Sequence, residues 1–506
     1  MPFPTPNTKW PLPEWEPVRS MVSDAAMWWE GDTGQLSSTY HGSYRPAQFS
    51  NGLVGDVSRW FWGAPDKQQR RRVHMPLAAD IAATSATLLF DRAPTFTHQD
   101  ETEQQRLDSV LDPNTFPSEL MVAGESCAAL GAVGWRVMWD EQMGEHPWIE
   151  WVDADAVFPT FRYGRLESVM FVEQLEALPG DKHVYRLFTE HERGRITYRL
   201  MAGHANSVGR IVSLGDHPAT IPLLNQVDET SAQYTDMTVM TAGYIPNARP
   251  VVGFRRDGQL RNIGRPDLTA DLFPLFDALD EVWTEIRAEM RLSRKKIIVP
   301  DWMLESRGFG QGTAFDNDRE VFSPLRGRPD TNQGIDIYAP ALRVDDMLTA
   351  ATAWTEKIIQ RANYSPASFG LDTSTGSGTP TAREIEARYD ASLRTWSAKS
   401  AYWVAGLKTA ATALLQRDRL MHGLHPDIEP PRVEMARPVQ ETLGDKAQTI
   451  QALDAARAIS TGEKVAMLRP EWDNQRQEQE VERILAEQSG TQFDPFDTDP
   501  DQQPDL

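Results

Sequence analysis

Cysteine is nearly absent from this sequence, with Cys127 alone in 506 residues. One thiol excludes a disulfide framework and any metal site built from several cysteines. The N-terminus is rich in proline and has no apolar stretch of the signal-peptide kind, and no run approaches eighteen apolar residues. We therefore expect a chain made in a reducing cytosol, without a signal peptide or a membrane-spanning helix.

Positive charge is also scarce. Lysine and arginine together number 51 against 73 aspartates and glutamates, which gives a formal net charge of −22. This balance argues against a protein whose main task is to bind nucleic acid by neutralising phosphates. It leaves open a protein through which DNA passes, because such a surface should avoid tight contacts.

Enzyme signatures are missing as well. No phosphate-binding loop of the G-x-x-x-x-G-K-S/T type occurs, and Gly376 and Gly378 lack the third glycine of a dinucleotide fingerprint. The stretch around Ser126 resembles a nucleophile elbow without its final glycine. His183 and His191 fall on neighbouring predicted strands and could share a metal, although solvated surface histidines are the commoner case. The sequence predicts no catalytic, cofactor-binding or metal-binding residues.

The front half reads as an α+β unit, residues 21–265, preceded by a proline-rich extended arm at residues 1–20. Apolar periodicity predicts helices at 21–31, 53–62, 74–90, 100–111 and 116–130. Short β-rich runs between turn residues predict strands at 135–139, 148–152, 168–173, 183–190, 195–200 and near 251–254.

The most informative stretch contains two amphipathic helices on either side of a short excursion, residues 293–343. The first helix lies within 266–292, and Leu279, Trp283 and Ile286 belong to its apolar stripe. Its other face is acidic. The second helix spans 344–363 and places Met347, Ala351, Trp354 and Ile358 on one face.

A basic cluster ends the first helix and consists of Arg291, Arg294, Lys295 and Lys296. It either complements the helix dipole or contacts phosphates or an acidic partner, and the sequence leaves both interpretations open.

A loop at residues 364–380 follows the second helix. It combines two apolar residues with an acidic residue and a run of small polar ones: Phe369, Leu371, Asp372, Thr373, Ser374, Gly376, Ser377 and Gly378. It is either a plain linker or a loop whose apolar residues pack while the remainder moves. A long helix and a return strand are predicted at 381–440, helices at 441–488, and a disordered acidic tail at 489–506.

The order helix, small tip, helix, flexible loop, long helix resembles the stem, clip, stem, tunnel loop and wing helix of tailed-phage portal proteins of the siphophage type. The C-terminal run is similar to a portal crown, with Glu441–Leu453, Ala458–Glu463, Arg469–Trp472 and Glu478–Glu487 in that order. The segment from Met75 to Pro94 resembles the early portal helix that ends in a proline. The resemblance covers about residues 70–488 in element order.

This resemblance implies an α+β portal fold, with the wing at 21–265 and 381–440, the stem at 266–292 and 344–363, the clip at 293–343, the tunnel loop at 364–380 and the crown at 441–488. It implies a non-enzymatic, cofactor-free ring of twelve copies at one capsid vertex of the virion, assembled in the cytoplasm of a host bacterium. Double-stranded DNA would pass through the ring. The expected partners are the terminase large subunit, the major capsid and scaffolding proteins, and a head-completion or adaptor protein. One alternative is a soluble bacterial α+β enzyme with an unrecognised active site, and another is a scaffold or adaptor protein without a channel.

Overall fold

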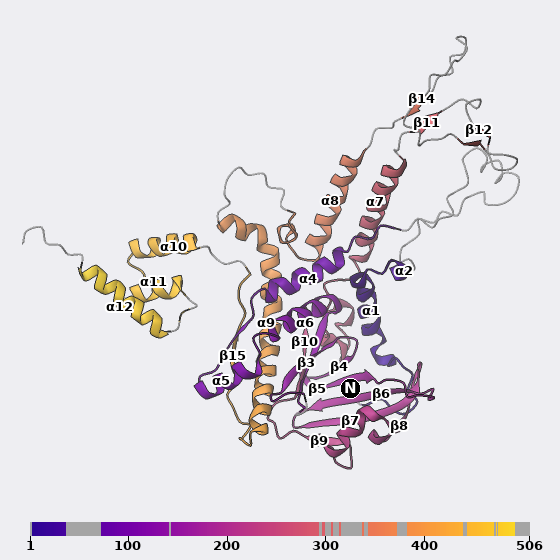
Figure 1. The fold of residues 1–506 in the computed structure, drawn as a ribbon, viewed down its shortest axis with the longest axis horizontal. Coiled ribbons are helices and arrows are strands. Elements are labelled where there is room, and N and C mark those ends of the chain that lie inside the picture. The colour runs from indigo at the N-terminus through magenta and orange to yellow at the C-terminus, as the bar shows by residue number, and fades with distance from the viewer. Residues whose placement is uncertain are drawn as a thin grey trace, which may run out of the picture. The chain divides into compact units, whose positions relative to one another are not determined.

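The structure is a computed structural model that describes residues 3–36, 72–140, 143–292, 296–298, 305–306, 313–314, 336–338, 343–371, 382–438, 443–469, 472 and 474–490. The chain divides into two compact units (Figure 1). The first contains residues 1–372 and 391–436, and the second contains residues 373–390 and 437–506.

Helices of the first unit, within the described residues, are α1 (Glu16–Glu30), α2 (Thr33–Leu36), α4 (Leu77–Phe90), α5 (Glu101–Val110), α6 (Phe116–Leu130), α7 (Phe273–Leu292), α8 (Val344–Arg361) and most of α9 (Ala382–Met421). The described strands are β1 (Thr95–Thr97), β2 (Ala132–Met138), β3 (Trp148–Asp153), β4 (Val157–Arg162), β5 (Arg165–Gln174), β6 (Val184–Glu192), β7 (Arg195–His204), β8 (Ser207–Val212), β9 (Ala232–Tyr234), β10 (Ala242–Pro246), β11 (Lys296–Ile298), β12 (Glu305–Ser306), β13 (Thr313–Ala314), β14 (Asp336–Tyr338) and β15 (Arg432–Glu434).

Two larger antiparallel sheets form most of the β part of the first unit, and the described residues add three two-stranded pairs, β1-β15, β11-β14 and β12-β13. The larger runs in the order β4-β5-β6-β7-β8, with β9 also paired to β7, and the smaller runs β10-β2-β3. The strands predicted between 135 and 200 are present as β2, β3, β5, β6 and β7. The strand predicted near 251–254 is wrong, because residues 252–254 form a 3-10 turn in which Val252 is 63% exposed and has no sheet to pack on.

The long helix α9 crosses the smaller sheet at close range. A Cβ atom at Gly406 would lie 2.4 Å from Ile245 of β10, so only glycine permits this approach. Next to it, Trp403 is fully buried and packs edge-on against Phe90 of α4, with ring centroids 4.8 Å apart. Helix α9 therefore joins the sheet to the helical layer of α4 and α6.

The N-terminal arm expected at residues 1–20 is shorter than predicted, because α1 already begins at Glu16. The preceding residues extend the larger sheet along β8, where Asn7 N donates to Gly209 O at 2.7 Å and Trp10 N donates to Asn206 O at 2.9 Å. The buried Arg186 guanidinium lies over the Trp10 ring at 4.8 Å. The arm is thus part of the folded unit and covers an edge strand that would otherwise be open.

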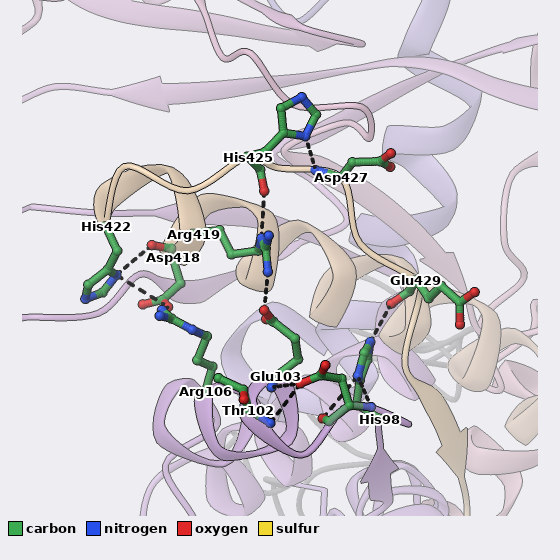
Figure 2. A network of polar contacts seen from close by, with 11 residues as sticks. His98, Thr102, Glu103, Arg106, Asp418, Arg419, His422, His425, Asp427 and Glu429 are labelled. Atoms are coloured by element: carbon green, nitrogen blue, oxygen red, sulfur yellow. Dashed lines mark hydrogen bonds and ion pairs between the residues drawn. The ribbon is translucent and has the colours of Figure 1, made fainter.

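A polar network holds the C-terminal end of α9 against α5 (Figure 2). Its centre is the buried carboxylate of Asp418, which accepts from Arg106 Nη1 and from His146 Nδ1, both at 3.0 Å. A second ion pair joins Arg419 to Glu103, and Arg419 Nε also donates to the carbonyl of His425 at 2.6 Å. These contacts fix the chain reversal at the end of α9.

Within its described residues, the second unit adds the helices α10 (Leu443–Ala455), α11 (Thr461–Leu468) and α12 (Asn474–Gly490). Ser460 and Glu463 form a capping box at the start of α11, which explains why the helix begins there. Lys464 Nζ pairs with Asp454 Oδ1 at 2.5 Å and joins α11 to α10. The helix predicted at 53–62 and most of the predicted tail lie outside the described residues.

Because His191 is buried, we expect the stability of the first unit to fall at acidic pH. His191 is 2% exposed, it shares a 2.7 Å hydrogen bond with Thr241 Oγ1, and burial lowers its pKa to about 3. In the unfolded state the pKa of His191 is near the ordinary histidine value of about 6.5. As pH falls, the unfolded state therefore binds a proton at this residue before the folded state does. The stability from this group is complete above about pH 6.5 and falls by about 1.4 kcal/mol per pH unit down toward pH 3.

Urea unfolding between pH 7 and pH 5 should show this loss, and His191→Gln should reduce the slope by about one proton. His204→Gln, which changes an exposed histidine, is the matched control. Equal slopes for all three proteins would contradict the assignment.

Candidate functional site

Helices α7 and α8 lie side by side and project together from the first unit (Figure 1). Their outer ends are brought together because β11, just after α7, pairs antiparallel with β14, just before α8. Both helices contribute to one buried cluster, with Phe276, Leu279 and Ile286 from α7 and Ala351 and Ile358 from α8.

Of the residues predicted to pack in this pair, Leu279, Ile286 and Ile358 are buried and Trp283 is partly buried. Trp354 differs, since it keeps 37% of its surface exposed. It lies about 60° around the helix from Ala351, at the edge of the strip that α7 covers. Leu348 of α8 and Met290 of α7 are also exposed, at 39% and 60%.

Two aspartates of the acidic face predicted for α7 make contacts inside the first unit. Asp280 is 1% exposed, and its two carboxylate oxygens accept from His74 Nδ1 at 2.8 Å and from Met75 N at 2.9 Å. One turn earlier, Asp277 forms an ion pair with Arg72. The segment before α4 therefore lies along α7 and fixes its direction.

A buried lysine joins the elements at the base of the helix pair. Lys399 Nζ of α9 donates to Ser85 Oγ of α4 at 2.6 Å, to Asp267 Oδ2 at 2.5 Å and to Tyr364 OH at 2.9 Å. Asp267 lies six residues before α7 and Tyr364 lies three residues after α8. Both members of the ion pair are less than 10% exposed.

The remaining hydrogen-bonding groups of this lysine cluster are satisfied. Tyr364 OH donates to Asp267 Oδ2 at 2.7 Å, and Asn247 Nδ2 donates to Asp267 Oδ1 at 2.9 Å. Burial, followed by the charge of Asp267, raises the pKa of Tyr364 well above its ordinary value. The phenol consequently stays a hydrogen-bond donor throughout the physiological range.

The first residues of the predicted tunnel loop are anchored on α9. Ser365 N donates to Ser392 Oγ at 2.9 Å, and the hydroxyls of Ser368 and Ser392 are 2.7 Å apart. Phe369 and Leu371 are partly buried against the main core. The loop predicted from sequence therefore begins with a packed portion.

Other predicted site residues fall where side chains are not described. Asp372, Thr373, Ser374, Gly376, Ser377 and Gly378 of the loop lie outside the described residues, as do Arg294 and Lys295. The backbones of Arg291 and Lys296 belong to α7 and β11.

The metal site considered for His183 and His191 is not formed. Both belong to one strand region, eight residues apart, which corresponds to about 26 Å along a strand. His183 instead contacts Asp181, at 2.6 Å. No group of histidine, cysteine and acidic residues in the described part of the chain could hold a metal ion. None of the helices described there is long and apolar enough to cross a membrane.

The family model described as "Phage portal protein, SPP1 Gp6-like" matches residues 47–493. The chain belongs to this family. Membership confirms the expected family and its α+β fold class, and it places the protein in the phage virion at the connection between head and tail. Portal proteins are structural components, which favours this assignment over the alternative of an unrecognised enzyme.

Several solved structures are similar to this portal protein. A chain titled "Neck of native GTA particle computed with C12 symmetry" is 14% identical, with 86% of this chain and 98% of that chain covered and a TM-score of 0.41. A chain titled "Neck of empty GTA particle computed with C6 symmetry" is 12% identical, with the same coverage and a TM-score of 0.42. No curated protein matches.

The lysine cluster predicts a large and specific loss of stability. Lys399→Met removes the cation and leaves Asp267 buried without it, which should cost about 3–5 kcal/mol of unfolding free energy. Lys408→Met, at an exposed position of the same helix, should cost less than about 1 kcal/mol. Urea denaturation of the two variants measures the difference, and similar midpoints would show that the buried pair contributes little.

Proposed function

We propose that this portal protein forms a closed ring of twelve copies at one capsid vertex and conducts double-stranded DNA during packaging and ejection. The main support for the proposal is the helix pair. Helices α7 and α8 pack against each other through one buried cluster, and they leave Met290, Leu348 and Trp354 exposed. A ring joins different patches of successive copies, so each chain needs apolar surface that it does not cover itself. The number twelve comes from the resemblance to portal proteins.

The charge balance supports the role of a conduit. Twelve copies at −22 give a formal charge of about −264 for the ring. DNA carries one negative charge per about 1.7 Å of duplex, so an acidic channel does not hold it tightly. Basic residues at the tip of the helix pair, Arg291, Arg294, Lys295 and Lys296, would then supply transient, salt-sensitive contacts.

The proposed ring also implies its partners. Residues 293–343 would dock the terminase large subunit, whose ATP hydrolysis drives packaging, and later a head-completion or adaptor protein. The absence of a phosphate-binding loop from this sequence fits a passive ring. Capsid and scaffolding proteins would surround it during assembly in the host cytoplasm.

Ring formation tests the proposal directly. Native mass spectrometry of the purified protein should show a ring of about twelve copies. Trp354→Asp places a charge on the exposed apolar edge of α8 and should weaken each subunit contact by about 2–4 kcal/mol.

Thr352→Asp is the matched control, since it adds the same charge about 160° away on the helix. A folded wild-type protein that stays monomeric would contradict the ring. If the two substitutions weaken the ring equally, Trp354 does not lie in the contact between subunits.

The loop after Leu371 should govern how DNA is held. It has no lysine or arginine between 372 and 381, so contact with DNA would be steric or through hydroxyl and backbone groups. Deleting Thr373–Gly378 should leave the ring intact, because the anchors at Ser365, Ser368 and Ser392 remain. DNA retention or packaging should fall, measured as the fraction of full heads, and an unchanged fraction would reduce the segment to a linker.

A further inference from the structure

A cleft of about 430 Å³ lies on the first unit, outside the helix pair. Its walls are aromatic and come from Trp10, Trp15, Trp29 and Phe158. One face of α1 lines it through residues 19, 22, 23, 26, 29 and 30, whose spacing of three and four places them along a single helical stripe. We call this feature the aromatic cleft.

Carboxylates line the cleft without a cation to balance them. Glu30, Asp153 and Asp155 are all exposed there, and none forms an ion pair with a described residue. Arg19 is the only described basic residue in the lining, and its guanidinium already pairs with Glu16 at 2.6 Å. The cleft therefore has an unbalanced negative potential.

Trp15 forms a rigid part of the cleft wall. Its side chain is 7% exposed, and its ring packs against that of Phe158 with centroids 5.3 Å apart. The aromatic surface of the cleft is therefore held in place by the fold.

These groups together specify a peptide with a cationic side chain. Guanidinium and ammonium groups bind on tryptophan faces and pair with carboxylates, and their aliphatic stems fill apolar clefts. A free inorganic cation would leave the aromatic walls unused.

We propose that the aromatic cleft of each copy binds residues 59–71 of a neighbouring copy in the ring. That segment carries the aromatic triplet 60–62, four basic residues and one acidic residue, in a chain of net charge −22: Arg59, Trp60, Phe61, Trp62, Asp66, Lys67, Arg70 and Arg71. Its chemistry complements the cleft. The inference rests on the proposed ring, because a closed ring needs two different, matching surfaces on every chain.

Engineered cysteines test this contact. Ser23 is exposed on the cleft face of α1, and Ser58 precedes Arg59 in sequence, so neither substitution removes a charge. The native Cys127 is buried and does not compete. On mild oxidation, the full-length Ser23→Cys/Ser58→Cys protein should form a ladder of covalently linked copies on a non-reducing gel. Mixed single variants should give linked dimers only.

Two controls make the result specific. Ser397→Cys/Ser58→Cys places the first thiol on an exposed position of α9 and should form at least about tenfold less cross-link, since no contact holds the thiols together. Adding Glu30→Gln and Asp155→Asn to the Ser23→Cys/Ser58→Cys protein should lower its yield about fivefold or more at low salt.

The outcomes separate this contact from the ring itself. A ring seen by native mass spectrometry without the ladder overturns the proposed contact and leaves the ring standing. A disulfide formed within one chain, detected as a linked monomer by mass, also overturns it, because the occupant is then the chain's own segment. A wild-type protein that forms no ring overturns the proposed function and this contact with it.

Discussion

The buried ammonium of Lys399 is the interaction on which the arrangement of the first unit depends. Its three hydrogen-bond partners come from α4, from the segment before α7 and from the segment after α8, while the lysine itself belongs to α9. A buried charge costs several kcal/mol unless it is paired and hydrogen-bonded, so these four segments must meet at one point. Removing any one of them would leave the others with an uncompensated polar group.

That constraint fixes the chain as far as the start of the loop after α8. Tyr364 is held by Lys399 and Asp267, Phe369 packs edge-on to Tyr364 with centroids 6.2 Å apart, and Ser392 binds the backbone at Ser365. The boundary between the two units comes directly afterwards, at residue 373. The anchored part of the loop therefore ends where the first unit ends along this stretch of the chain.

Periodicity predicted the elements well and the buried polar contacts poorly. Helix α6 begins and ends where the pattern and Gly131 place it, and α9 begins within one residue of the prediction. Lys399 could not be found this way, because nothing in the sequence of an amphipathic helix distinguishes a buried lysine from a solvated one. Asp280 was assigned to an acidic outer face for the same reason, since its partner at His74 is about two hundred residues away in the chain.

The N-terminal arm shows a second limit of sequence reasoning. Proline at alternate positions predicts an extended chain. The segment before α1 pairs with β8 around Lys9 but forms a 3-10 turn at Pro13–Trp15, and the prolines do not indicate what the chain lies against. Arg186 supports the pairing with β8. Its buried guanidinium donates to the carbonyls of His204 and Ser207 and lies over the ring of Trp10. Such long-range contacts carry no local signal.

The acidic residues of α7 show how stability and function divide one helix. Asp277 pairs with Arg72 and Asp280 is hydrogen-bonded to His74 inside the unit. Glu281, Glu285 and Glu289 have no ion-pair partner among the described residues. Like charges four residues apart destabilise a helix by about 0.2–0.5 kcal/mol per pair, so packing against α8 must offset them. In the proposed ring the three glutamates recur on every copy, and the same repulsion that weakens one helix would keep phosphates away from the stem. The buried contacts of Lys399 with Asp267 and Tyr364 hold the base of the helix pair in place, so that α7 stays packed on α8 despite this repulsion.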